Sequence, residues 1–107
     1  MALARPQDLL REIRKRLQAA YGDRLQGVVL YGSVARGQAG PESDVDVLVL
    51  LRDPLDYLRD LEAAIAAVYP LSVELGRRIS AKPVSAAAYE TVDCPLYRSA
   101  HREGIAA

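Results

Sequence analysis

Residues 28–51 read VVLYGSVARGQAGPESDVDVLVLL, and this stretch decides the fold. Gly32 and Ser33 are followed by ten residues and then by Asp44, with Asp46 two positions further on. Apolar runs precede the glycine and follow the second aspartate. Side chains at i and i+2 of a strand lie on the same face, so we expect both carboxylates to point the same way. The pattern predicts two buried strands. Polar residues stand at the end of the first strand and at the start of the second.

The residue types in this pattern suit a site for a divalent metal ion and a nucleoside triphosphate. Two carboxylates spaced about 7 Å apart along a strand can share Mg²⁺ with phosphate oxygens. Gly32 lets the backbone approach a phosphate, because a Cβ atom there would intrude. Ser33 offers a hydroxyl and begins a helical turn whose free N–H groups favour an anion. Arg36 lies one turn further on and can reach the same phosphates, and Tyr31 is expected near the nucleotide.

Each of these residues also has a plain structural interpretation. Asp44 can end a loop, Gly32 and Ser33 can form an ordinary turn, and Arg36 can form a surface ion pair. Asp46 is harder to explain in this way, because a carboxylate inside an apolar strand needs a cation or a hydrogen-bond partner. We therefore predict that the two aspartates bind metal, and we leave both roles open for Arg36.

Composition limits the size and class of the protein. The 107 residues leave room for one domain, expected over 1–107, and 50% of them are hydrophobic. No apolar run approaches the roughly 20 residues of a membrane span. The single cysteine, Cys94, fits a reducing, cytoplasmic setting. Fourteen basic residues balance fourteen acidic ones, which argues against a protein that grips long nucleic acid.

Periodicity and turn residues predict alternating helices and strands in the order α-β-α-β-α-β-α. Strands are expected at 27–31, 44–51 and 77–84, and helices at 6–20, 33–37, 54–75, 86–91 and 95–102. Leu9, Leu10, Ile13 and Leu17 recur at helical spacing and predict a buried stripe on the first helix. Gly76 is expected to end the third helix, Ser85 to cap the fourth, and His101 to lie at the surface. The strand that begins at Asp44 is nearly continuous in apolar residues, which is typical of a central strand covered on both faces. These elements predict an α/β (α+β) domain with a small mixed β-sheet flanked by helices.

The pattern resembles that of the nucleotidyltransferase superfamily that includes DNA polymerase beta, and most closely its smallest members, the minimal nucleotidyltransferase (MNT) proteins. The motifs that carry the resemblance are Gly32-Ser33-x-Ala35-Arg36-Gly37 and Ser43-Asp44-x-Asp46. The element order extends it over nearly the whole chain. The resemblance implies a nucleotidyltransferase-like fold with Asp44 and Asp46 as catalytic, Mg²⁺-binding residues. It further implies an NTP, such as ATP, held by Gly32, Ser33, Arg36 and Ser43.

The same resemblance implies a partner. MNT proteins frequently pair with a small helical HEPN protein as a toxin–antitoxin module, and can transfer AMP to a tyrosine hydroxyl of that partner. We therefore expect an Mg²⁺-dependent enzyme that moves NMP, most simply AMP from ATP, onto a hydroxyl acceptor. A catalytically degenerate antitoxin that neutralises its partner by contact is the alternative. A second copy of the chain is another candidate for completing the cleft.

One departure from the family pattern bears on activity. Family enzymes usually carry a third carboxylate on the next strand, but residues 78–82 read RISAK, so Ser80 stands where that carboxylate belongs. Alternation places Arg78, Ser80 and Lys82 on one strand face. Lys82 can help to hold a triphosphate but cannot accept a proton while charged. A solvated edge is the alternative for this face, and Glu74 or Asp53 are the other candidates for the missing carboxylate.

Overall fold

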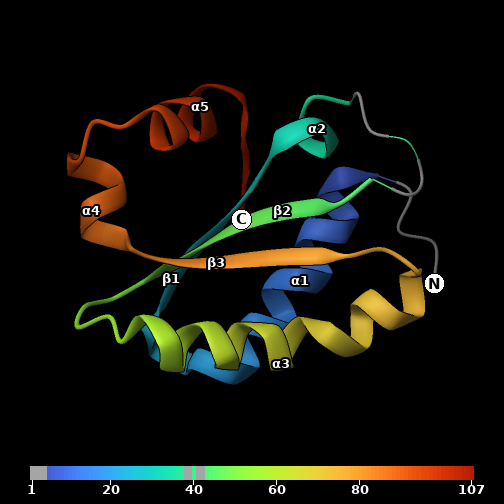
Figure 1. Cartoon of the computed structure of the whole chain (residues 1–107), viewed down its shortest axis with the longest axis horizontal. Helices are drawn as coiled ribbons and strands as arrows, with labels where there is room; N and C mark the ends of the chain where they lie inside the picture. The colour runs from blue at the N-terminus through green and yellow to red at the C-terminus, as the bar shows by residue number, and fades with distance from the viewer. Residues whose placement is uncertain (1–4, 38–39, 41–42) are drawn as a thin grey trace.

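The computed structural model describes residues 5–37, 40 and 43–107. Figure 1 shows a twisted sheet with the long helix α3 below it, the long helix α1 crossing behind it, and shorter helices above. In chain order the elements are α1 (Pro6–Tyr21), the 3₁₀ turn η1 (Gly22–Arg24), β1 (Leu25–Tyr31), α2 (Gly32–Ala35), β2 (Val45–Leu51), α3 (Tyr57–Leu75), β3 (Ile79–Ser85), α4 (Ala86–Thr91), α5 (Pro95–Glu103) and β4 (Ile105–Ala106). Among the described residues, no helix is both long and apolar enough to cross a membrane.

The sheet is mixed, which confirms the predicted fold class. Its strand order is β3-β2-β1-β4, with β1 antiparallel to both β2 and β4. Strands β2 and β3 are parallel, and α3 forms the crossover that a parallel pair requires. The two strands that carry the Gly-Ser and Asp-x-Asp motifs are therefore the central strands of the sheet.

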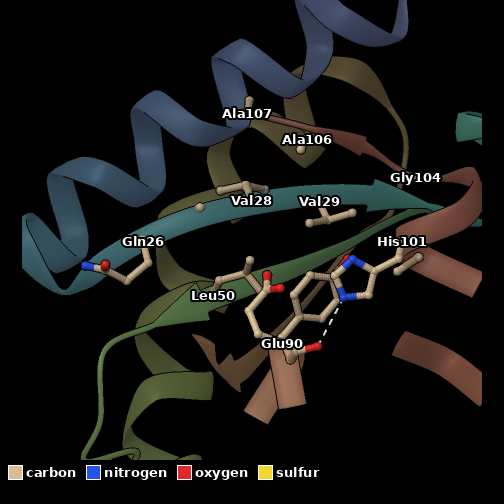
Figure 2. A pocket seen from close by; sticks show the side chains of 12 residues that line it. Gln26, Val28, Val29, Leu50, Glu90, His101, Gly104, Ala106 and Ala107 are labelled. Carbon is tan, nitrogen blue, oxygen red and sulfur yellow. Dashed lines mark hydrogen bonds between the residues drawn. The ribbon is translucent and has the colours of Figure 1, made fainter. Parts of the chain in front are cut away.

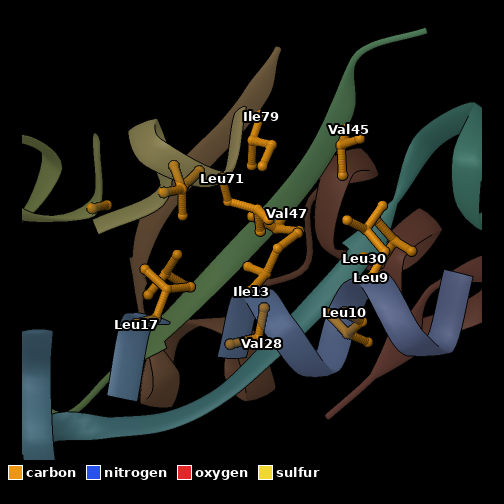
Figure 3. Packing of buried hydrophobic residues seen from close by; sticks show 14 of the residues in the cluster. Leu9, Leu10, Ile13, Leu17, Val28, Leu30, Val45, Val47, Leu71 and Ile79 are labelled. Carbon is orange, nitrogen blue, oxygen red and sulfur yellow. The ribbon is translucent and has the colours of Figure 1, made fainter. Parts of the chain in front are cut away.

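A large core fills the space between the sheet and the two long helices (Figure 3). The stripe predicted on α1 is fully buried against this face. Alternate residues of β2, starting at Val45, point into the same core, as the two-residue period of a strand requires. The principal contributors are Leu9, Leu10, Ile13, Leu17, Val28, Leu30, Val45, Val47, Val49, Leu51, Val68 and Leu71.

A smaller cluster covers only part of the opposite face. It joins Val29, Leu48 and Val84 of the sheet to Tyr89 of α4 and Ala100 of α5. Asp46 lies on this same face, two residues before Leu48, where the apolar cover stops. One face of the sheet is therefore closed throughout, and the other is open where β2 begins.

Helix ends follow local side-chain chemistry. α3 begins at Tyr57 and not at Pro54, because the Asp56 carboxylate accepts a hydrogen bond from the Arg59 N–H at 3.3 Å and caps the helix there. Gly76 ends the same helix in the left-handed conformation, as predicted. Ser85 caps α4 through the Ala88 N–H at 3.2 Å, also as predicted. Strand β4 was not predicted.

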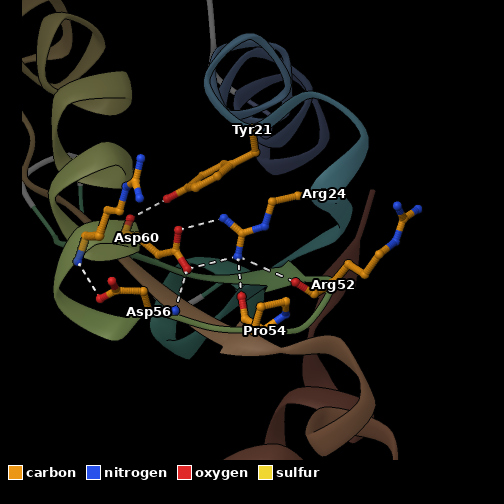
Figure 4. A network of polar contacts seen from close by, with 7 residues as sticks. Tyr21, Arg24, Arg52, Pro54, Asp56 and Asp60 are labelled. Carbon is orange, nitrogen blue, oxygen red and sulfur yellow. Dashed lines mark hydrogen bonds and ion pairs between the residues drawn. The ribbon is translucent and has the colours of Figure 1, made fainter.

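A buried ion pair fixes the start of α3 to η1 (Figure 4). Asp60 is only 3% exposed, and the Arg24 guanidinium donates to both of its oxygens, at 2.8 and 3.0 Å. The Asp56 N–H donates to the same carboxylate at 3.1 Å. The Tyr21 hydroxyl donates to the Asp60 carbonyl. This network meets the requirement that a buried charge be paired and hydrogen-bonded.

Candidate active site

Strands β1 and β2 bring the two sequence motifs into contact. Tyr31 pairs with Asp46 across the antiparallel ladder, so Gly32 follows directly beside the aspartate. A Cβ atom built on Gly32 would lie 2.8 Å from Asp46 Oδ2, and the Gly32 backbone has a φ of +76°. Both the space and the conformation therefore require glycine at this position. The predicted proximity of the Gly-Ser turn and the Asp-x-Asp motif is present in the structure.

Ionisation of Asp46 is disfavoured by its surroundings. Burial raises the pKa of the half-buried Asp46, and the charge of Asp44 raises it further, whereas Arg78 lowers it. Asp44 itself is exposed and precedes the first residue of β2. An acid pair with these properties favours a bound cation, which would neutralise both carboxylates.

The carboxylates of Asp44 and Asp46 suit Mg²⁺, which keeps water and phosphate ligands, better than a metal ion whose ligands all come from the protein. Within the described part of the chain, no group of three or more His, Cys, Asp or Glu side chains is placed to hold a metal ion. Mg²⁺ in nucleotide sites is commonly held by one or two carboxylates together with substrate phosphates and water. Asp44 and Asp46 supply that number of carboxylates, and the absence of a Cβ atom at Gly32 lets the backbone lie close to Asp46.

Ser80 lies next to Asp46 on the neighbouring strand. The parallel register of β2 and β3 pairs these two residues, so their side chains share the open face of the sheet. The neighbouring position that the family resemblance assigns to a third carboxylate is therefore occupied by a hydroxyl. Alternation along β3 places Arg78 and Lys82 on the same face, on either side of Ser80.

Neither of the other acidic candidates replaces that carboxylate. Glu74 lies on α3, against the closed face, and forms an ion pair with Arg16 of α1 at 3.4 Å. Asp53 follows the far end of β2 and accepts a hydrogen bond from the Ser85 hydroxyl at 2.8 Å. Nothing in the sequence indicated either contact, because each joins residues that lie far apart along the chain.

Ser33 and Arg36 lie on the short helical segment that follows the turn. Ser33 is the second residue of α2 and is half-buried. The Arg36 N–H donates to the Gly32 carbonyl at 3.2 Å and closes this turn. The Arg36 guanidinium lies 3.5 Å from the Glu103 carboxylate of α5. The ion-pair interpretation of Arg36 is thus the one found in the structure, and its contact with phosphate stays a prediction.

Sequence reasoning missed Arg77, which holds the residue before Asp44. Its guanidinium donates two hydrogen bonds to the Ser43 carbonyl, at 3.1 and 3.0 Å. The Ser43 hydroxyl accepts the Gly40 N–H at 3.0 Å. These contacts of Ser43 fix the backbone directly before Asp44. The role of Ser43 in nucleotide binding stays a prediction. An arginine that follows a helix-ending glycine carries no sequence signal for such a contact.

Tyr31 shares the open face with Asp46. Burial raises the pKa of its hydroxyl, and the nearby Asp46 charge raises it further. The ring packs against the smaller apolar cluster. Its contact with a nucleotide stays a prediction, but its place beside the two motifs agrees with that expectation.

A separate pocket of about 310 Å³ opens toward the other end of β1 (Figure 2). Its lining includes Gln26, Glu90 and His101. The His101 ring stacks on Tyr89 at 4.0 Å, and its Nε2 atom lies 3.1 Å from the Tyr89 carbonyl oxygen. The pocket has no lining residue in common with the Gly-Ser and Asp-x-Asp motifs. The exposed His101 agrees with the expectation of a surface residue.

Comparison with known families matches residues 10–94 to the nucleotidyltransferase domain. The chain belongs to this family. The match spans β1, β2 and β3 and includes both motifs, which confirms the resemblance drawn from the residues.

Relatives in Methanocaldococcus jannaschii carry a more specific name. "Putative protein adenylyltransferase MJ0141" is 41% identical over 46 residues, which are 43% of this chain and 46% of that protein. "Putative protein adenylyltransferase MJ1215" is 29% identical over 75 residues, which are 68% of this chain and 85% of the relative. The match to the first relative spans about half of its length.

Solved structures share the fold. A toxin–antitoxin crystal structure with AMP-PNP matches with a TM-score of 0.65 at 23% identity, covering 90% of this chain and 69% of the other. A complex of tri-AMPylated Shewanella oneidensis HEPN toxin with MNT antitoxin gives 0.60 at 21%, covering 94% and 69%. A structure described as "putative minimal nucleotidyltransferase" gives 0.56 at 24%, covering 98% of both chains. At these identities the likeness shows the minimal nucleotidyltransferase fold.

Proposed function

We propose that this chain is an Mg²⁺-dependent protein adenylyltransferase that transfers AMP from ATP to a hydroxyl group. The contact that carries the proposal is the approach of Gly32 to Asp46, with Asp44 close by. It places the Gly-Ser turn, whose backbone can approach a phosphate, next to an acid pair that favours a cation. The relatives' names support the protein acceptor, and the structures with AMP-PNP and with an AMPylated toxin support the nucleotide.

In the proposed reaction, the acceptor oxygen attacks the α-phosphorus of ATP. A new P–O bond to the acceptor forms, the bond to the bridging oxygen of the β-phosphate breaks, and pyrophosphate leaves. When bound, Mg²⁺ supplies neutralisation of the triphosphate charge. Asp44 and Asp46 would hold it, and Gly32, which has no Cβ atom, lets the backbone lie close to Asp46. Lys82, on the same face, adds positive charge toward the triphosphate.

On β3 the residue beside Asp46 is Ser80, where a carboxylate would accept the acceptor proton, so in the proposed reaction that proton passes to water. A tyrosine hydroxyl, with an ordinary pKa of about 10, loses its proton more readily than an aliphatic hydroxyl. This favours a tyrosine acceptor, and a HEPN-type helical partner is the proposed source of it.

The proposal is tested by label transfer from ATP that is radioactive at the α-phosphate. The chain is mixed with Mg²⁺ and the product of its neighbouring gene, and labelled protein is separated on a gel. We expect wild type and Asp53→Asn to label the partner, and Asp46→Asn to lose at least about a hundredfold in rate. Asp53 is the matched control, because it follows the opposite end of the same strand.

The second candidate is an antitoxin that has lost catalysis, and Ser80 is the observation that favours it. Such a protein would neutralise its partner without labelling it, and neutralisation would survive the double change Asp44→Asn and Asp46→Asn. Equal labelling by wild type and Asp46→Asn would contradict the proposed enzyme.

A further inference from the structure

Helix α3 exposes an apolar stripe that none of the described residues covers. Six large hydrophobic side chains are exposed among the described residues, and five of them lie on this helix. Leu58, Ile65, Tyr69 and Val73 are spaced by seven, four and four residues, so they share one side of the helix. Single exposed apolar residues are ordinary, but a continuous stripe of them marks an interaction surface.

The C-terminal half of this stripe borders a groove of about 380 Å³ between α3 and the start of β3. Ile65, Val73 and Ile79 are among the apolar side chains that line it. Arg77 and Arg78 also line the groove and give it positive charge. The groove therefore suits an apolar side chain that has a carboxylate nearby.

The N-terminal half of the same stripe provides such a group. Leu58 is 71% exposed, the highest value among the exposed large hydrophobic residues. Glu62 follows one helical turn later on the same side and is also exposed. One end of α3 thus presents an apolar side chain with an acid beside it, and the other end presents an apolar groove with two arginines.

We propose that a second copy of this chain docks on this surface, with the two α3 helices antiparallel. A twofold axis near Tyr69 brings Leu58 and Glu62 of each copy to the groove and arginines of the other. Both contacts then form together, as an isologous interface requires. α3 is about 28 Å long at the usual rise per residue, so the contact is short and the dimer reversible.

The neighbouring sheet edge does not offer an equivalent contact. The Arg78 carbonyl accepts the Val45 N–H of β2, so residues 79, 81, 83 and 85 turn their backbone groups outward. Pro83 falls in this outward set and has no N–H to donate. Strand addition at β3 is therefore weakened, and the α3 side chains remain as the contact surface.

This inference does not depend on the proposed function. The stripe belongs to a helix packed on the closed face of the sheet, whereas Asp46 lies on the open face. Arg78 borders both surfaces, because it lines the groove and also lies near Asp46.

The test is sedimentation equilibrium of the full chain from about 1 to 500 μM, a range that spans weak association. We expect a reversible monomer–dimer equilibrium. Leu58→Arg should raise the dissociation constant at least about tenfold, because it removes an apolar anchor from both symmetric contacts and brings a positive charge to Arg77 and Arg78. Val92→Arg is the matched control, because Val92 is 50% exposed and lies outside α3. It should leave the equilibrium unchanged.

Circular dichroism establishes that each variant is folded, and Ile65→Glu replaces Leu58→Arg if the latter is not. Glu62→Lys should also weaken the dimer, because it places like charge beside Arg77 and Arg78. A chain that stays monomeric throughout the range overturns the proposal, and so does a dimer that Leu58→Arg and Ile65→Glu leave intact. A monomer that binds a helical partner through this stripe overturns it as well.

Discussion

Asp60 and Asp46 are two aspartates in largely apolar surroundings, and the fold shifts their pKa values in opposite directions. The hydrogen bonds from Arg24 hold the pKa of Asp60 below its usual value, and the Asp56 N–H adds to this effect. Burial and the charge of Asp44 raise the pKa of Asp46, and only Arg78 opposes them. The more deeply buried of the two carboxylates is therefore the one that ionises more readily.

The difference shows which carboxylate the chain satisfies by itself. At Asp60 the protein supplies the cation, and the pair fixes α3 to the rest of the fold (Figure 4). At Asp46 the charge is left to be balanced from outside, next to a glycine that keeps space open. A structural acid and a candidate functional acid can thus be separated by their partners, even though they are the same residue type.

The largest expected effect is on the space beside Asp46. Gly32→Ala places a methyl group 2.8 Å from the Asp46 carboxylate and strains a backbone φ of +76°. We expect adenylyl transfer to fall about a hundredfold, because carboxylate and phosphate are both displaced. Gly76→Ala is the matched control. Its φ is +63° and its added Cβ would meet nothing within 4 Å, so stability should fall by a similar amount while activity is retained. Equal activity of the two variants in the label-transfer assay would contradict the assigned role of Gly32.

The next largest effect is on the free energy of unfolding when Asp60 is changed, the aspartate that Arg24 pairs with. Asp60→Asn removes the charge that pairs with Arg24, and we expect a loss of about 1–3 kcal/mol in the free energy of unfolding at pH 7. The folded pKa of Asp60 is lowered, so its stabilisation is present above the unfolded pKa of about 3.9 and is lost as pH falls through the folded value. Urea denaturation between pH 7 and 3 should show the wild-type advantage shrinking. An advantage that is constant with pH would mean that charge pairing is not its source.

A third change adds an acid where the register places Ser80. Ser80→Asp puts a carboxylate beside Asp46 on the open face, and we expect affinity for Mg²⁺ to rise by about tenfold as ligand charge increases. The measurement is the Mg²⁺ concentration needed for half of the maximal thermal stabilisation. A change at Asp53, at the far end of β2, would remove a carboxylate and is not a control for adding one. Thr91→Asp on α4 adds a carboxylate at an exposed position and serves as the control. No gain in affinity would place Ser80 outside the metal site.

The smallest expected effect is on the stability of the protein when Asp46 is changed, the aspartate whose charge is left to be balanced from outside. The folded pKa of Asp46 is raised, so its ionised form opposes folding above the unfolded pKa, and this cost disappears as pH falls below that value. Without divalent cations, Asp46→Asn should therefore be as stable as wild type or slightly more stable at pH 7. Added Mg²⁺ should stabilise wild type and not the variant. Thermal melts with and without EDTA measure both, and a large loss of stability in the variant would make Asp46 a structural residue.

The sequence was sufficient for the features that depend on local pattern. A charged residue inside the apolar run of β2 identified Asp46, and its spacing from Gly32 identified the turn that approaches it. Alternation along residues 78–82 placed Ser80 on the face that the register with Asp46 now shows. The buried stripe of α1 followed from its helical period.

The features that the sequence did not reveal depend on contacts between distant segments. Arg24 and Asp60 lie 36 residues apart, and neither is unusual in its local sequence. The same holds for Arg77 and Ser43, which are 34 residues apart. β4 contains only Ile105 and Ala106, too few residues for a periodic pattern.

The pairing of β4 with β1 also affects how the protein folds during synthesis. Val29 pairs with Ala106 and Leu30 with Ile105, so one edge of β1 stays unpaired until residues 105–106 have left the ribosome. An unpaired strand edge is a template for association with other chains. The segment that presents Gly32 therefore keeps an unpaired edge until β4 docks on it.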